Sequence, residues 1–379
     1  MVFVVNLGRL VFAPLIEPLR RALVVDAAAV GLLATLVWIG SALLRLPTGY
    51  ALTKFPRHYV VLATGLLLAG SSFVASVAPG IRALQASALM MGMASGAYFI
   101  AANPLVSELF PERIGQAIGI HGTASQLAAV GAPLFVSAVL AGDTWEATFE
   151  YIAALTLAAT VLFTVAAWRT DLPDAGADDR DLLDAVRHQW RIVLTAVVIL
   201  GVAGFVWQGV FNFYVSYLVA AKSVAEPTAR QLLSLTFGAG VPAFLLSGRL
   251  SDRFPVVPYM LAVVGGFAAM LVVLTVTDGF LALAAVSVVL GFVIHSLFPA
   301  VDAYLLGTLP DRHRASAYAA YSATMMAIQA GGSGAVGLLV DAGVTFDLVF
   351  QAFAAVLLVV LAGLVVAERG GLLPTGAEA

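Results

Sequence analysis

The sequence Gly248-Arg-Leu-Ser-Asp-Arg-Phe-Pro255 is a short charged stretch between two long apolar segments. A related stretch, Gly49-Tyr-Ala-Leu-Thr-Lys-Phe-Pro56, occurs 199 residues earlier. A second pair has the same offset, because Leu109-Phe-Pro-Glu-Arg113 aligns with Thr308-Leu-Pro-Asp-Arg312. Two motifs that share one offset predict that the chain contains two copies of one structural unit.

The composition is that of a membrane protein. Of the 379 residues, 61% are apolar and only 11% are charged, and the mean hydropathy is +1.00. A soluble protein has about 25% charged residues, so most of this chain must contact lipid. This excludes a soluble enzyme, a nucleic-acid-binding domain and a disordered protein. The net charge of −3 indicates no polyionic partner, and the absence of cysteine excludes thiol chemistry, cysteine-ligated metals and disulfides.

Long apolar windows set the number of membrane spans. A helix needs about 20 mostly apolar residues to cross the hydrocarbon core of a bilayer. Windows of this kind lie between the charged clusters, at residues 1–19, 27–52, 59–78, 82–107, 114–140, 147–168, 191–219, 230–250, 257–277, 279–307, 315–340 and 345–367. We therefore predict an all-α integral membrane protein with twelve transmembrane helices in two six-helix repeats.

Six spans bring the chain back to the side on which it started, so the two repeats are expected to be parallel. We expect an N-terminal lobe at residues 1–168, a linker at 169–190, a C-terminal lobe at 191–368 and a tail at 369–379. The linker is rich in charge and includes an amphipathic segment, Leu182–Trp190, which predicts a short helix.

The distribution of positive charge predicts the orientation. With both termini in the cytoplasm, the connections carry twelve Lys and Arg residues on the inner side and five on the outer side. Positively charged loops resist translocation, so we expect a multi-pass protein of the cytoplasmic membrane with both termini inside. The first window begins at Met1 without a basic region or a cleavage site. A cleaved signal peptide is therefore not expected, and a truncated start stays open.

The charged stretch between the eighth and ninth windows resembles the loop motif G-x-L-x-D-R of the major facilitator superfamily. The matching residues are Gly248, Leu250, Asp252 and Arg253. The family's full pattern is roughly G-x-L-x-D-R-x-G-R-K. In the first half it is degraded to Gly49, Lys54 and Arg57, since Thr53 stands at the position of the acid and Pro56 replaces the second glycine. Two shorter stretches are similar to further signatures of the family, with one departure each: Arg82-Ala-Leu-Gln85, followed by Ala86, and Gly131-Ala-Pro133.

The resemblance implies a secondary transporter in which two lobes rock about a central cavity lined by helices 1, 4, 7 and 10. It also implies gating roles for Gly248, Asp252, Arg253 and Arg82. Because the first-half stretch lacks its acid, the clamp is expected to be asymmetric and to depend mainly on Asp252. The alternative is that Asp252 is a static helix-capping acid in a positively charged loop.

Polar side chains at membrane depth are the candidate substrate contacts. Asn6 and Arg9 are three residues apart and so share one helix face. Arg9 lies too deep in its window to reach either surface easily, and its guanidinium could bind a substrate carboxylate or phosphate through two hydrogen bonds. The alternative is an internal arginine that bonds helix carbonyls or Asp302.

The second half offers further candidates. Gln208 is equivalent to Arg9 at the offset of 199 and shares a helix face with Asn212. Gln126 and Gln329 could reach the cavity from more distant helices. The glycines of Gly331-Gly332-Ser333-Gly334 permit close helix approach or bending.

Three residues have two open interpretations. Asn103 and Asp302 are equivalent at the same offset and could form an inner gate or contact the substrate. His295 could carry a proton during transport, or it could be a neutral, hydrogen-bonded residue of the bundle core.

No nucleotide-binding loop, HExxH motif or G-x-S-x-G motif is present, and the five histidines are scattered along the chain. We therefore expect no enzyme activity, no metal and no cofactor.

The predicted function is secondary transport of a small organic solute, with a bias to anions or zwitterions. We expect the protein to work as a monomer in lipid, with a possible coupling proton or ion. Two alternatives stay open: a non-transporting sensor, and a proton-coupled efflux antiporter for hydrophobic compounds. Two features favour the antiporter: the element Gly131-Ala-Pro133, and an aromatic wall made of Trp38, Tyr98, Trp207, Phe211, Tyr214 and Tyr217.

Overall fold

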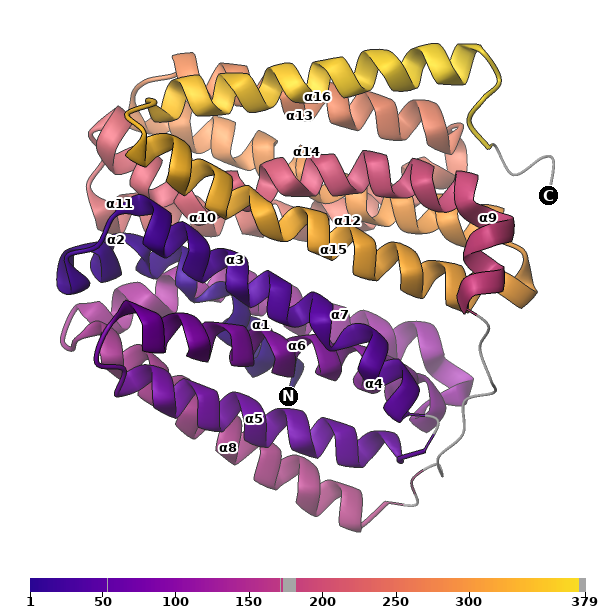
Figure 1. Cartoon of the computed structure of the whole chain (residues 1–379), viewed down its shortest axis with the longest axis horizontal. Coiled ribbons are helices and arrows are strands. Elements are labelled where there is room, and N and C mark those ends of the chain that lie inside the picture. The colour runs from indigo at the N-terminus through magenta and orange to yellow at the C-terminus, as the bar shows by residue number, and fades with distance from the viewer. Residues whose placement is uncertain (53, 171, 173–181, 375–379) are drawn as a thin grey trace. The chain divides into compact units, whose positions relative to one another are not determined.

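The computed structural model describes residues 1–52, 54–170, 172 and 182–374, and within them all regular structure is helical (Figure 1). The chain forms two compact units, Met1–Asp179 and Arg180–Ala379, here called unit 1 and unit 2. Thr53, the degraded position of the first-half motif, lies outside the described residues, as does most of the stretch at 171–181.

Unit 1 is built from long apolar helices and one 3-10 turn. Its elements are α1 (Val2–Leu10), α2 (Phe12–Leu23), α3 (Ala27–Leu43), α4 (Arg45–Ala51), α5 (Arg57–Ser76), α6 (Ile81–Leu109), η1 (Pro111–Arg113), α7 (Ile114–Leu140) and α8 (Trp145–Trp168).

Unit 2 begins with the helix that the linker sequence predicts over Leu182–Trp190, here the start of α9. Its elements are α9 (Leu182–Ala196), the π-helical turn η2 (Val197–Gly201), α10 (Val202–Lys222), α11 (Glu226–Gly238), α12 (Gly240–Arg253), α13 (Val256–Val276), α14 (Phe280–Thr308), α15 (Asp311–Asp341) and α16 (Phe346–Arg369).

Among the described residues, eleven helical segments are long and apolar enough to cross a membrane, and the bent pair α1–α2 supplies a twelfth. The prediction of twelve spans is confirmed. The first window is not one straight helix, however, because α1 and α2 are bent by 41° at Val11. Pro14 explains the break: it has no N–H to donate to the Leu10 carbonyl, and its ring crowds the preceding turn.

Helix boundaries repeat between the two units at the offset seen in the sequence. Helix α6 and helix α14 begin 199 residues apart and end 199 residues apart. The helices α2 and α10 also end at equivalent positions, each followed by a residue in the left-handed region, Val24 at φ 51° and Ser223 at φ 52°. These two are the non-glycine residues with positive φ in the described part of the chain. The two units are therefore copies of one six-span fold.

Equivalent helices also pack in equivalent pairs within each unit. Helix α3 lies against α6, and α5 against α8; in unit 2, α11 and α12 lie against α14, and α13 against α16 (Figure 1). Small residues permit the α3–α6 approach. A methyl group on Gly40 would lie 2.2 Å from the Leu89 carbonyl oxygen, and one on Gly96 would lie 2.2 Å from that of Ser41. Such close backbone contact is typical of helix pairs in lipid.

Candidate functional site

Arg9 and Asn6 form the polar centre of unit 1, near the end of α1. Nη2 of Arg9 donates to Oδ1 of Asn6 over 2.6 Å, which confirms the prediction that the two share a face. Nδ2 of Asn6 in turn donates to the Ser125 carbonyl of α7 over 2.7 Å. Asn6 is buried, so its amide is held at both ends and fixes the position of the guanidinium.

Aromatic rings enclose the Arg9 guanidinium. Its central carbon lies 4.6 Å from the ring centre of Trp38 on α3 and 5.3 Å from that of Phe99 on α6. Both distances fall within the range of a cation–π contact, which stabilises the charge without neutralising it. Beyond Phe99, the Tyr98 hydroxyl and Nε2 of His121 are 3.1 Å apart, so α6 and α7 are joined by a hydrogen bond beside the guanidinium.

No carboxylate of unit 1 balances the charge of Arg9 within the described residues. Its Nε is buried and has no hydrogen-bond partner in that part of the chain. Arg45, at the start of α4, is close enough for its positive charge to act on Arg9. The Arg9 guanidinium therefore has an N–H donor without an acceptor and a second positive charge nearby. Both features favour the binding of an anion.

In unit 2 the amide residues Gln208 and Asn212 of α10 are hydrogen-bonded to Ser333 of α15. Nδ2 of Asn212 donates to the Gln208 carbonyl over 2.9 Å and to the Ser333 hydroxyl over 2.9 Å. The Ser333 hydroxyl donates to the same Gln208 carbonyl over 3.0 Å. Gln208 and Asn212 therefore share a face, as predicted, and their hydrogen bonds hold two helices together.

Glycines bring α10 and α15 close enough for this network. A methyl group on Gly332 would lie 1.9 Å from the Phe205 carbonyl oxygen, and one on Gly204 would overlap the Gln329 amide. Nε2 of Gln329 donates to the Leu200 carbonyl over 3.1 Å. The close approach expected of the Gly331–Gly334 stretch is thus observed, and Gln329 serves as a helix-to-helix link.

His295 is buried in α14 among aromatic rings. Its Nδ1 lies 2.7 Å from the Gly291 carbonyl oxygen, which can only accept, so Nδ1 carries the proton. The nearest ring centres are those of Trp207 at 5.4 Å and Phe237 at 5.9 Å. Gly240 makes room for the imidazole, since a methyl group there would lie 2.8 Å from it. This environment fits a hydrogen-bonded core histidine.

An ion pair links α5 to the last turn of α6 in unit 1. Nη2 of Arg57 lies 2.9 Å from Oε1 of Glu108, and Arg57 is 8% exposed. The first-half charged stretch itself has no acid, because Thr53 stands at that position. Glu108 supplies one from a different helix.

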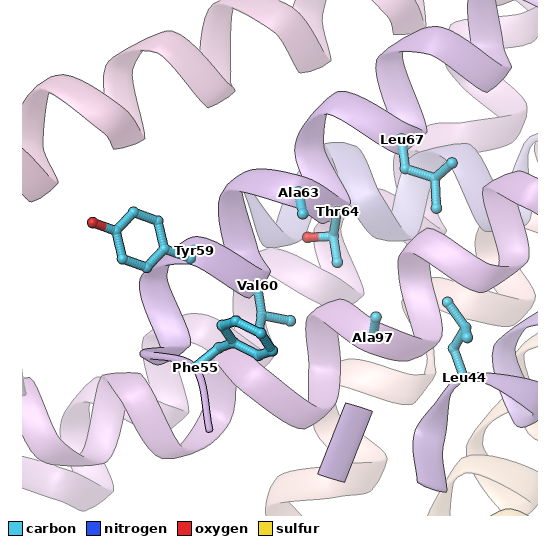
Figure 2. Close-up of a pocket in the computed structure, with 8 residues that line it drawn as sticks. All are labelled: Leu44, Phe55, Tyr59, Val60, Ala63, Thr64, Leu67 and Ala97. Atoms are coloured by element: carbon cyan, nitrogen blue, oxygen red, sulfur yellow. The ribbon is translucent and has the colours of Figure 1, made fainter. Parts of the chain in front are cut away.

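One groove of about 340 Å³ lies on unit 1 between α5, α6 and the end of α3 (Figure 2). Its lining residues are Leu44, Phe55, Tyr59, Val60, Ala63, Thr64, Leu67 and Ala97. The Thr64 hydroxyl already donates to the Val61 carbonyl over 2.7 Å. The lining is mostly apolar and carries no charged group.

The family model of the Major Facilitator Superfamily matches residues 1–225 and 210–375. The chain belongs to this superfamily.

The relatives and solved structures agree with this assignment. An uncharacterised transporter of the major facilitator superfamily type, YwfA of Bacillus subtilis (strain 168), is 24% identical over 93% of this chain and 90% of its own length. A bacterial homologue of the human lysosomal transporter Spinster, in an inward-facing and unoccupied conformation, has a TM-score of 0.79 at 15% identity, covering 100% of this chain and 97% of its own. A point mutant of the nucleoside transporter NupG has a TM-score of 0.81 at 16% identity, and the match covers 96% of this chain and 98% of the NupG chain. The protein is a multi-pass membrane transporter.

The gating residues that the superfamily motif implies are only partly described. Arg253, at the end of α12, and Arg82, at the start of α6, are exposed. Gly248 and Asp252 lie within α12, but their surroundings are outside the described residues. A gating role for these four positions stays a prediction.

The equivalent residues Asn103 and Asp302 differ in their surroundings. Asn103, on α6, is exposed, whereas Asp302, on α14, is half-buried and accepts a hydrogen bond from the Tyr318 hydroxyl over 2.9 Å. Gln126, on α7, is half-buried one residue beyond Ser125, the partner of Asn6. Of the predicted substrate contacts in unit 1, Asn6 and Arg9 are thus in direct contact, whereas the role of Gln126 stays a prediction.

Sequence reasoning missed three members of the unit 1 site. Phe99, His121 and Arg45 were not singled out as contacts, although Trp38 and Tyr98 were assigned to an aromatic wall. His121 lies seven residues into α7, and its depth in an apolar segment was the available signal. The position of Phe99 against Arg9 depends on how α1 packs between α6 and α7, which no local pattern encodes.

Proposed function

We propose that this transporter moves a small organic anion or zwitterion, with Arg9 binding the substrate carboxylate or phosphate. The supporting observation is the guanidinium itself: it is held by Asn6, stacked on Trp38 and Phe99, and has a buried Nε without a partner in the described part of unit 1. An arginine anchored in this way keeps a bidentate donor pair in place at little entropic cost.

Neighbouring residues have supporting roles in the proposal. In this proposal Asn6 orients the guanidinium, Arg45 raises the local positive potential, and Gln126 bonds a polar group of the solute. Gln208, Asn212 and Gln329 are retained as contributions from the second half. Each of these three already makes a hydrogen bond within unit 2.

The proposed cycle is alternating access between lobes at residues 1–168 and 191–368, joined by a linker at 169–190 and followed by a tail at 369–379. Both termini are placed in the cytoplasm by the positive-inside distribution. The proposed gate consists of Asp252, Arg253, Gly248, Arg82 and the pair Asn103 and Asp302. The transporter is proposed to work as a monomer in the cytoplasmic membrane.

Counterflow into proteoliposomes tests the proposal. Vesicles loaded with dicarboxylates, phosphate esters, amino acids or lipophilic cations are assayed separately, with wild type, Arg9→Lys, Arg9→Gln and the exposed control Arg21→Gln. We expect exchange of at least one anion, a loss of about tenfold or more for both Arg9 variants, and no loss for the control. Anion exchange that Arg9→Gln leaves unchanged would remove Arg9 from the binding site.

A second candidate is proton-coupled efflux of hydrophobic compounds, favoured by the aromatic rings around His295. In the same vesicles this function predicts movement of lipophilic cations that depends on a pH gradient, is lost in His295→Gln and survives in Arg9→Gln. A sensor that transports nothing predicts no movement of any solute in the panel.

A further inference from the structure

Three side chains with metal-ligating atoms meet where α9 packs against the start of α15. Asp184 and His188 are four residues apart on one face of α9, and His313 comes from the first turn of α15. Nδ1 of His188 lies 3.1 Å from Oδ1 of Asp184, and Nε2 of His313 lies 3.2 Å from its Oδ2. One ligand atom from each residue fits within a span of 4.8 Å. The scattered histidines of the sequence are therefore partly gathered by the fold.

These separations match a tetrahedral metal site. With zinc at about 2.0–2.1 Å from each ligand, adjacent ligand atoms of a tetrahedron are about 3.3 Å apart. Each histidine nitrogen already lies close to this distance from the carboxylate, although the two nitrogens contact different oxygens of Asp184. The two imidazole ring centres are 5.5 Å apart, and His188 is exposed. Nδ1 of His188 also lies 2.9 Å from the Asp184 carbonyl oxygen, to which it donates, so it binds an ion only after losing that proton.

The surroundings of His313 provide the support that a metal-ligating histidine needs. His313 is buried, and its other ring nitrogen, Nδ1, lies 3.3 Å from the Gln189 side-chain amide. A half-turn of this amide would offer its oxygen to an Nδ1–H and leave Nε2 free to bind an ion. Gln189 has non-helical angles, φ −111° and ψ 20°, and this kink in α9 allows its side chain to reach His313.

We propose that Asp184, His188 and His313 bind a divalent transition-metal ion, for which Zn²⁺ is the best match. Two imidazole nitrogens with one carboxylate favour zinc-like ions over Mg²⁺ or Ca²⁺, which select oxygen ligands. Three protein ligands leave a fourth position for water. Because the ligands come from two helices, the ion cross-links α9 to α15 within unit 2. Asp184 and His313 precede the apolar spans Val186–Lys222 and Ser316–Asp341, so the site is at the edge of the membrane-spanning region.

Zinc binding to the purified full-length protein, with any polyhistidine tag removed, tests the proposal. The probe is Zn²⁺ itself, measured by competition with a chromophoric chelator, and Co²⁺ as a spectroscopic substitute. We expect one equivalent of Zn²⁺, a tetrahedral Co²⁺ absorption spectrum and a higher Tm in the presence of zinc. His188→Ala and His313→Ala should each weaken binding at least tenfold and abolish the rise in Tm.

His58→Ala is the matched control, since it removes a half-buried histidine of unit 1 from α5 and should leave zinc binding unchanged. Asp184→Asn tests the carboxylate without loss of volume. A wild-type protein that binds no stoichiometric Zn²⁺, or variants that bind as well as wild type, would overturn the proposal. The measurement needs no transport, so its result is independent of the proposed substrate.

Discussion

Gly92 and Gly291 have the same structural role in the two units. A methyl group on Gly92 would lie 2.0 Å from the Val37 carbonyl oxygen, and one on Gly291 would lie 2.0 Å from that of Thr236. The glycines are 199 residues apart, and so are Val37 and Thr236. The repeat therefore preserves a specific backbone-to-backbone contact in addition to the loop motifs.

Gly92→Ala and Gly291→Ala should each destabilise their unit, because the added carbon overlaps a backbone carbonyl that cannot rotate away. The expected loss is about 1–3 kcal/mol or more, read as a lower Tm in detergent. Gly70→Ala is the control, since nothing lies within 4 Å of a methyl group at that position. An unchanged Tm for Gly92→Ala would show that α3 and α6 are less closely packed than described.

Breaking the ion pair of Arg57 and Glu108 should destabilise unit 1. Glu108→Gln leaves the nearly buried Arg57 guanidinium without its carboxylate, and we expect a loss of about 2 kcal/mol in thermal unfolding. The exchange Arg57→Glu with Glu108→Arg should recover part of that loss. If the double variant is no more stable than the less stable of the single variants Arg57→Glu and Glu108→Arg, the two side chains do not form a direct ion pair.

Trp38→Leu should weaken anion binding, because it removes an aromatic face from the Arg9 guanidinium while leaving a side chain that fills space. A cation–π contact contributes about 0.5–2 kcal/mol, so the Kd should rise several-fold. Trp38→Phe retains a ring and should have the smaller effect. Ligand-dependent thermal stabilisation measures both, and equal Kd values for the two variants would contradict the role assigned to the ring.

Asn212→Ala should lower stability more than it lowers substrate affinity. It removes hydrogen bonds to Ser333 and Gln208 at a buried contact of α10 with α15, for which we expect a loss of about 1–3 kcal/mol. Ser333→Ala, which removes the partner from the other helix, should produce a similar decrease in Tm. If Asn212→Ala has wild-type Tm and impaired transport, substrate contact is the main role of Asn212, and its helix-to-helix hydrogen bonds matter little for stability.

The helical architecture was predictable because each element carries its own signal. Apolar windows and an internal offset of 199 residues are local or pairwise patterns, and they predicted the twelve spans. The break at Val11 was missed, although Pro14 marks it, because the window was judged by apolarity alone.

The site was less predictable because side-chain partners depend on tertiary packing. The spacing of Asn6 and Arg9 predicted their shared face, whereas the cation–π contact with Phe99 required the position of α6. The approach of His188 to His313 likewise joins residues far apart in sequence. Gln208 and Asn212 were correctly placed on one face, but the facing Ser333 hydroxyl could not be inferred from their spacing.

Pro14 leaves the Leu10 carbonyl without its usual helical partner, two residues before α2 begins its regular course. Because that bond is already absent, α2 can pivot at Val11 without breaking it. Arg9 lies in the last turn before this hinge, on the side anchored to α7 through Asn6. Movement of α2 about this bend would thus leave the hydrogen bonds that hold the guanidinium intact.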